Sequence, residues 1–243
     1  MSVLTIIQAA FDEIGFPRPA SVVGNTDQLA RQALALLNRE GKQLARSHDW
    51  KVLVREHSFA TVNGTSDYAF PADFDHFIDD TGWNRSDTEP LVGPMSAQHW
   101  QEIKSGTLGS GAYGQRWRVK RSTSGAITNK FVLDPTPTEI ETLVFEYVST
   151  SWCADATGAT GQNAFALDTD IPILHEHLLI QGLIWRLLKA KGLEYGDALA
   201  EYQATVRVEQ ARDGGSPKLS MVGGRRGLTL ISSRNIPDTG FGA

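Results

Sequence analysis

The sequence predicts an α+β fold, in which N- and C-terminal helix pairs form a four-helix bundle with an inserted antiparallel β-rich domain and an extended C-terminal arm. Apolar residues recur three and four positions apart near both ends of the chain, and this spacing shortens toward two in the middle. The last residues are rich in Gly, Ser and Arg and show no periodicity. We expect residues 1–49 and 168–215 to form the helical bundle domain, residues 50–167 the inserted domain and residues 216–243 the arm.

Two helices are predicted in the N-terminal part. Residues 3–14 carry apolar side chains at helical spacing and are followed by a Gly-Phe-Pro stop. A second helix is predicted over residues 27–48, with Asn25 and Thr26 as candidate caps and Gln28 three residues after Asn25. Only Glu40 interrupts its apolar face.

Two further helices are predicted in the C-terminal part. Asp168 and Asp170 are candidate caps for the first, with Pro172 in its first turn and a stop after Lys191. The second is predicted over residues 195–212 and is closed by a Gly-Gly pair.

Between the helix pairs the pattern favours strands. These are expected at residues 51–59, 115–121, 126–133 and 143–150. Residues 122–125 are a plausible hairpin loop. Residues 72–80 and 96–104 are predicted to form short helices.

Composition limits the classes of protein that this chain can represent. Cys153 is the only cysteine, so no disulfide framework can form within the chain, and no Cys/His cluster has metal-ligand spacing. The first residues lack a basic start and a cleavage site, so we expect no secretory signal. No apolar run approaches the roughly 20 residues that cross a bilayer, so we expect no membrane partner.

Charge is unevenly distributed along the chain. The net charge is −5, yet residues 216–243 hold four basic residues and one acidic residue. Residues 1–215 hold 19 basic and 27 acidic residues, a net charge of −8. An acidic body argues against a duplex-binding surface, which needs clustered basic residues, and the basic arm is the exception.

Candidate cofactor and metal motifs lack their required context. Residues 109–114 match G-x-G-x-x-G, but a predicted helix precedes them and a strand follows, the reverse of a dinucleotide site. His175 and His177 lie two apart on a predicted helix, so they cannot clamp one metal ion. We therefore expect no cofactor and no metal.

Paired carboxylates leave an enzymatic alternative open. The pairs are Asp73/Asp75, Asp79/Asp80, Glu139/Glu141 and Asp168/Asp170. Two such groups could serve a cell-wall glycan hydrolase, but helix capping accounts for several of them. We expect no catalytic residues and no enzymatic activity.

Tryptophans are the other conspicuous feature. We expect five of them to lie in the core or at subunit interfaces: Trp50, Trp83, Trp100, Trp117 and Trp185. Tryptophan beside arginine could instead stack the bases of single-stranded nucleic acid, which is a second alternative.

Several sequence blocks resemble one known family. Residues 68–85, YAFPADFDHFIDDTGWNR, are similar to the Y-x-L-P-x-D-F-x-R-x-I-x-D-T-x-W-D-R pattern of phage adaptor proteins, with departures at Phe70, His76 and Asn84. Further similar blocks lie at residues 90–101, 145–152, 182–186 and 191–195. Together they resemble the podovirus head-to-tail adaptor family, which includes tail tubular protein A and tail accessory factor proteins.

This resemblance implies a non-enzymatic virion protein at the head-tail junction, made in the host cytoplasm. It implies a dodecameric ring with the phage portal protein above, a tail nozzle or tail tube protein below, and genomic DNA passing through without sequence-specific binding. By the same resemblance, the arm is expected to bind the portal. The arm residues that would do so are Arg225, Arg226, Leu228, Leu230, Ile231 and Arg234.

Overall fold

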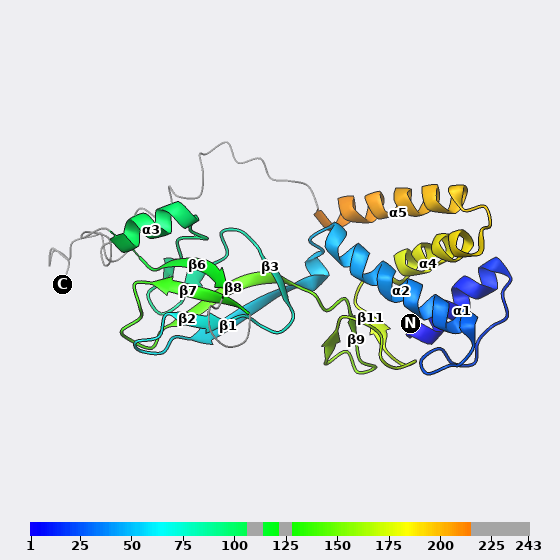
Figure 1. The fold of residues 1–243 in the computed structure, drawn as a ribbon, viewed down its shortest axis with the longest axis horizontal. Helices are drawn as coiled ribbons and strands as arrows, with labels where there is room; N and C mark the ends of the chain where they lie inside the picture. Colours follow the sequence, from blue (N-terminus) through cyan, green and yellow to red (C-terminus); the bar gives the residue numbers. More distant parts are fainter. Residues whose placement is uncertain (106–113, 122–127, 215–243) are drawn as a thin grey trace, which may run out of the picture. The chain divides into compact units, whose positions relative to one another are not determined.

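The computed structural model describes residues 1–105, 114–121 and 128–214 (Figure 1). Five α-helices and several antiparallel sheets make up this part of the chain, which confirms the predicted α+β class. The described residues form two compact units. We call residues 1–55, 73–75 and 148–214 the helical unit, and residues 56–72 and 76–147 the sheet unit, and describe each by itself.

Helix α1 (Val3–Ile14) begins and ends as its sequence predicts. The Ser2 side chain accepts a hydrogen bond from the Thr5 backbone N–H, and Gly15 closes the helix with a φ of 78°. A left-handed residue at this position is best supplied by glycine. The apolar face, which includes Ile6, Ile7 and Phe11, is buried.

Helix α2 (Gln28–Ser47) is also confirmed, but its cap differs from the prediction. Asp27 is the cap, and its side chain accepts a hydrogen bond from Ala30 N–H. Asn25 instead accepts from Asp27 N–H and so supports the cap from outside the helix. Glu40, the one break in the apolar face, is fully buried.

Helix α4 (Glu176–Lys191) starts later than predicted. Asp168 accepts hydrogen bonds from the N–H groups of Val22 and Val23, and Asp170 accepts from those of Ala166 and Leu167. Both carboxylates therefore cap loops rather than this helix. Pro172 lies in strand β11, and the helix begins only after that strand.

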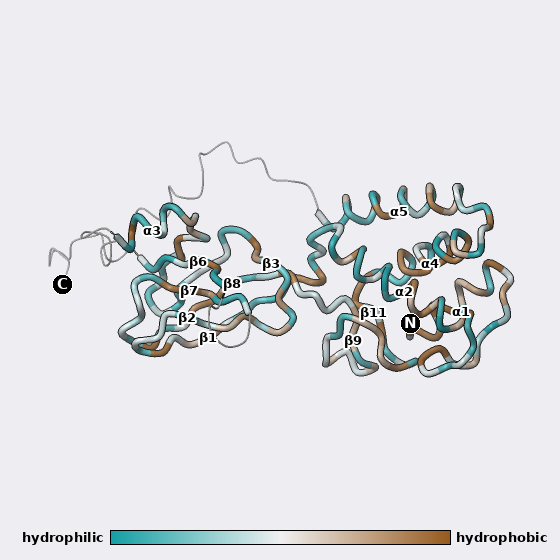
Figure 2. The backbone as a smooth tube through the Cα atoms, viewed as in Figure 1, coloured by the Kyte–Doolittle hydropathy of each residue, from teal (hydrophilic) through white to brown (hydrophobic). Residues whose placement is uncertain are grey.

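Helix α5 (Gly196–Gly214) completes the helical unit. Helix α4 packs against α1, α2 and α5 (Figure 1). Along α5 the tube alternates between teal and brown (Figure 2), and no residue of this helix is buried. A small sheet with the order β10-β9-β11 completes the unit: β9 (Cys153–Ala154), β10 (Gly161–Gln162) and β11 (Ile171–Pro172).

The remaining strands form two sheets. One has the order β1-β8-β4-β5, with β3 also paired to β8, and the other has the order β2-β7-β6. Their bounds are β1 (Val54–Ala60), β2 (Asp67–Ala69), β3 (Phe74–Phe77), β4 (Trp83–Asn84), β5 (Glu89–Pro90), β6 (Arg116–Arg121), β7 (Asn129–Asp134) and β8 (Thr142–Ser149). Strands β1, β3 and β8 contain residues of both units.

The strand predictions are confirmed for β6, β7 and β8, and α3 (Ala97–Ser105) confirms the helix predicted near residue 96. Residues 51–53 form a 3₁₀ turn before β1 rather than strand. The helix predicted over residues 72–80 is wrong, because residues 74–77 are strand β3. The predicted hairpin loop, residues 122–125, lies outside the described residues.

An aromatic cluster forms the core of the sheet unit. The Phe131 ring is stacked on Trp117 and on Phe145, with centroids 4.9 and 5.5 Å apart. Phe77 of β3 contacts the same rings, 4.4 Å from Trp117. Burial of Phe77 against this cluster favours the extended backbone over the helix that its sequence indicates.

Candidate interaction surfaces

The five tryptophans that were predicted for core or interface differ in exposure. Trp50, Trp100 and Trp117 are buried within their own units, and Trp185 is half-buried. Trp83 is 37% exposed. Of these five, Trp83 is therefore the side chain most available to a partner.

Several predicted sites fall outside the described residues. They are the arm residues Arg225, Arg226, Leu228, Leu230, Ile231 and Arg234, and all of the G-x-G-x-x-G segment except Gly114. The two histidines of the C-terminal part are described. His175 is the cap residue of α4, with Nε2 3.9 Å from a Glu209 carboxylate oxygen, and His177 is exposed within the first turn. In the described ranges no group of three or more His, Cys, Asp or Glu residues could hold a metal ion.

Some of the paired carboxylates are engaged in structural hydrogen bonds. Asp73 accepts from the Ser149 hydroxyl at 2.6 Å and lies 3.3 Å from Arg55. Asp168 and Asp170 hold loop backbone, as described above. These groups therefore act as acceptors that tie segments of the helical unit together.

A cavity of about 180 Å³ in the sheet unit is lined by Asn84, Asp87, Glu89 and Glu141, among others. The Asn84 amide donates to Glu141 at 2.9 Å, and its oxygen accepts from the Asp87 N–H. An ionised aspartate at this position could accept but not donate. The departure from the family pattern at residue 84 thus supplies a hydrogen bond to a neighbouring carboxylate.

A buried polar cluster joins three helices and was not predicted. Arg186 of α4 pairs with Glu40 of α2 and donates to Gln43 at 2.8 Å, and the Tyr202 hydroxyl of α5 donates to Glu40. Burial, reinforced by the Glu40 charge, raises the pKa of Tyr202 above its ordinary value. Gly182 of α4 makes room for this cluster, since a Cβ there would lie 2.6 Å from Glu40 Cγ.

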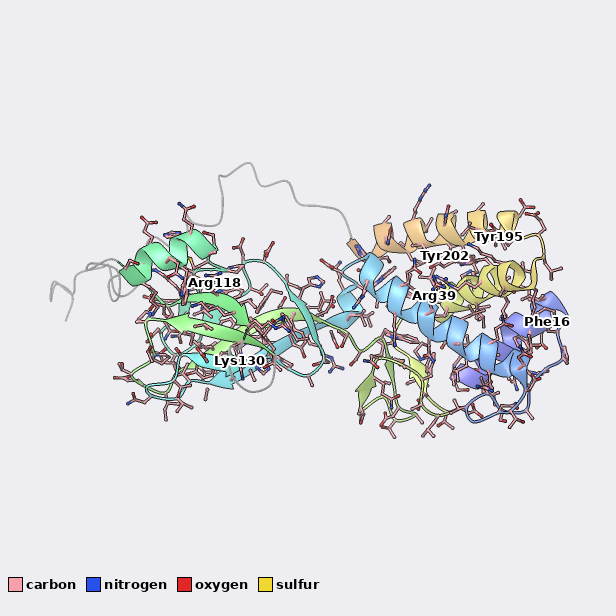
Figure 3. The ribbon with its side chains drawn as sticks, viewed as in Figure 1. Phe16, Arg39, Arg118, Lys130, Tyr195 and Tyr202 are labelled. Carbon is pink, nitrogen blue, oxygen red and sulfur yellow. The ribbon has the colours of Figure 1, made fainter. Side chains whose placement is uncertain are left out.

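A basic face covers one side of the sheet unit. Five of the seven lysines and arginines among its described residues lie on this side of α3, β6 and β7: Lys104, Arg116, Arg118, Lys120 and Lys130. Arg121, one residue after Lys120 in β6, is on the opposite face of the sheet. Lys120 stands directly opposite Lys130 in the antiparallel register, and a cross-strand pair of like charges is destabilising by itself. Figure 3 labels Arg118 and Lys130 on this sheet.

This face exposes charged side chains but no aromatic ring on which a nucleic-acid base could stack. Lys104 and Lys120 both lie over the Trp100 ring, with Nζ 5.5 and 4.8 Å from its centroid. Trp100 and Trp117 are 2% and 4% exposed. Neither ring is available for base stacking in this conformation.

Comparison with known protein families gives a match over most of the chain. A family model described as SU10 adaptor protein matches residues 1–222, which include every described residue. A search of curated proteins finds no match. Among the described helices, none combines the length and apolar composition of a membrane-spanning segment.

Proposed function

Because this chain belongs to the SU10 adaptor protein family, we propose that it is the head-to-tail adaptor subunit of a short-tailed bacteriophage. Family membership makes it a structural adaptor protein of a phage virion. In our proposal, twelve copies form a ring between the portal and the tail nozzle, at the head-tail junction of a podovirus. The ring continues the channel through which DNA is ejected, and the subunits are made in the host cytoplasm.

The length of the family match carries this proposal. It extends over the helical unit and the sheet unit, so the adaptor role applies to both rather than to one fragment. A ring with partners above and below needs several different contact surfaces on each subunit. The exposed Trp83 and the basic face of the sheet unit are candidates for such contacts.

We propose that the four helices α1, α2, α4 and α5 act as one bundle, within a helical domain formed by residues 1–49 and 168–215. Contacts of α4 with the other three helices support this arrangement. Residues 50–167 would form the inserted domain, and residues 216–243 the arm that binds the portal.

We propose no enzymatic activity. Three carboxylates that could have served as catalytic groups of a glycan hydrolase instead accept structural hydrogen bonds. Asp73 accepts from a hydroxyl group, and Asp168 and Asp170 accept from backbone N–H groups. Burial of Trp100 and Trp117 weighs against single-strand binding by base stacking. We infer that DNA passes the ring without sequence-specific contacts.

Electron microscopy of the full chain, with and without purified portals, tests the proposal. We expect rings of twelve subunits on portals. A truncated variant lacking residues 221–243 should remain folded and bind portals poorly, with the full chain as its control. If the full chain formed no ring and did not bind purified portals, the proposed function would be wrong.

A further inference from the structure

The outer side of α2 carries four basic residues and no acidic one. They are Arg31, Arg39, Lys42 and Arg46, all exposed, and Figure 3 labels Arg39. At 100° per residue their spacing keeps them within about 80° of one another around the helix axis, opposite the buried residues. Glu40, the one acidic residue of α2, is fully buried. We call these four residues the basic α2 face.

The charges of the basic α2 face are not paired with a neighbour. In the ranges that the structure describes, no side chain forms an ion pair or a hydrogen bond with any of the four. Asp27, at the start of the helix, is its cap and accepts a hydrogen bond from Ala30 N–H. Like charges three or four residues apart repel one another and destabilise a helix. A bound polyanion would relieve this repulsion.

The basic α2 face has almost no apolar surface. Within the arc of the four cations α2 presents two other residues, Gln28 and Ala35, both exposed. Protein–protein interfaces depend on an apolar centre in which a few large side chains are buried. Helix α2 contains no aromatic residue at all. A polar and strongly positive surface is instead typical of proteins that contact DNA.

The kind of cation also favours phosphate groups. Three of the four are arginines, whose planar guanidinium fork fits two phosphate oxygens and keeps its charge. From the first to the fourth cation the helix rises about 22 Å at 1.5 Å per residue. Duplex DNA carries one negative charge per roughly 1.7 Å of its axis, so many phosphates lie within this span. A single strand would need exposed rings for base stacking, which this face lacks.

The basic face of the sheet unit is more engaged with its own neighbours. Lys104 forms an ion pair with Asp134, and both Lys104 and Lys120 lie over the Trp100 ring. No such partner lies over the basic α2 face among the described residues. The α2 cations are therefore more available to an external anion, although the chain as a whole is acidic.

We propose that the basic α2 face binds the phosphate backbone of duplex DNA without reading its sequence. This inference rests on the proposed function, which brings genomic DNA past every subunit, and it adds a contact that ring assembly does not require. Phosphate contacts by themselves carry no sequence information. A ring repeats the face in every copy, so weak contacts of single subunits would add up along the DNA. An acidic protein surface is the competing partner.

A titration of the full chain with a random-sequence duplex, followed by fluorescence anisotropy at several salt concentrations, tests this proposal. The variant Arg39→Gln/Lys42→Gln removes two of the four charges. Each phosphate contact contributes about −0.9 to the slope of log K against log salt concentration, so the variant should flatten this slope by about 1.8. At 0.1 M salt that difference corresponds to an affinity about 60-fold lower, for proteins that bind equally at 1 M salt.

Two control variants separate this face from charge in general. Lys51→Gln/Lys191→Gln removes the same charge from two exposed lysines of the helical unit outside the face, and it should bind like the unchanged protein. Arg39→Lys keeps the charge and should keep the slope. The basic arm is unchanged in all of these proteins, so its contribution is the same in each. Thermal melting should show that every variant is folded.

Each other result overturns the inference. It is wrong if the unchanged protein does not bind the duplex at low salt, or if the Arg39→Gln/Lys42→Gln variant binds as well as the lysine control. Equal losses in both variants would show a general effect of charge rather than this face. Normal DNA binding together with weaker binding to purified portals would assign the face to an acidic protein surface. Rings on portals are scored separately, and their absence from the unchanged protein would count against the proposed function whatever the titration gives.

Discussion

Replacing Arg186 with methionine should destabilise the helical unit strongly. Glu40 is 0% exposed, and Arg186 is the only cation that pairs with it among the described residues. Arg186→Met keeps an apolar stem of similar length but leaves a buried carboxylate without its counter-charge. Removing one partner of a buried ion pair costs about 3–5 kcal/mol.

This cost can be measured by thermal unfolding, followed by far-UV circular dichroism. For a chain of this size, each kcal/mol lowers Tm by about 2–4 °C, so the expected fall is about 6–20 °C. The double variant Glu40→Leu/Arg186→Met removes both charges and should recover most of the loss, because an apolar pair can replace a buried ion pair at little cost. The reasoning is refuted if the double variant is no more stable than Arg186→Met alone.

Three smaller changes test other parts of the structure. Trp100→Ala should lower stability by about 3–5 kcal/mol in denaturant unfolding, whereas Trp83→Ala, at a partly exposed ring, should cost clearly less; equal losses would contradict the burial difference. Gly41→Ala places a Cβ only 2.3–2.4 Å from three carbons of the Trp152 ring and should cost about 1–3 kcal/mol by the same measurement; unchanged stability would contradict that packing. Burial raises the pKa of the Cys153 thiol to about 12, so the unfolded chain, with a thiol pKa of about 8.5, loses its proton first as pH rises. The thiol's contribution to stability should therefore be present below pH 8.5 or so and decrease toward pH 12 or so, a dependence that the Cys153→Ala variant should lack.

Periodicity was sufficient to predict the five α-helices of the described residues but not all of their boundaries. Asp168, Asp170 and Pro172 have the residue types and order of a helix start, and local sequence gives no sign that these carboxylates bind other segments. Asp168 accepts from residues 22 and 23, which are about 146 positions away in sequence. The choice between a helix cap and a loop cap depends on tertiary structure.

The strand β3 shows the same limit for the sheet unit. Pro71 followed by Asp73 resembles a helix start, and the following residues do not alternate cleanly. Phe77 nevertheless packs into a cluster built from β6, β7 and β8, and hydrogen bonds to β8 fix its backbone as strand. Burial against residues distant in sequence decides the conformation here.

The candidate surfaces were predictable only in part. The sequence indicates which tryptophans could be buried or exposed to partners, but cannot rank Trp83 against Trp100. It also marks Glu40 as an anomaly on an apolar face without revealing Arg186, which lies 146 residues later. A charged residue in the middle of an apolar helix face is the one signal that could have led to this cluster.

The buried cluster and the proposed ring belong to one argument about geometry. Apolar burial is non-directional, so apolar side chains alone let packed helices shift relative to one another. The fork of Arg186 and the hydroxyl of Tyr202 both converge on Glu40, and charge-assisted hydrogen bonds of this kind are directional. They fix how α2 and α5 are set against α4, and with that the shape of the helical unit that a ring would repeat. A ring closes only if this shape is the same in every subunit. The Glu40→Leu/Arg186→Met variant separates the two effects: it should recover thermal stability yet assemble less completely than the unchanged protein. Full assembly of that variant would show that the ion pair does not set the geometry that a ring requires.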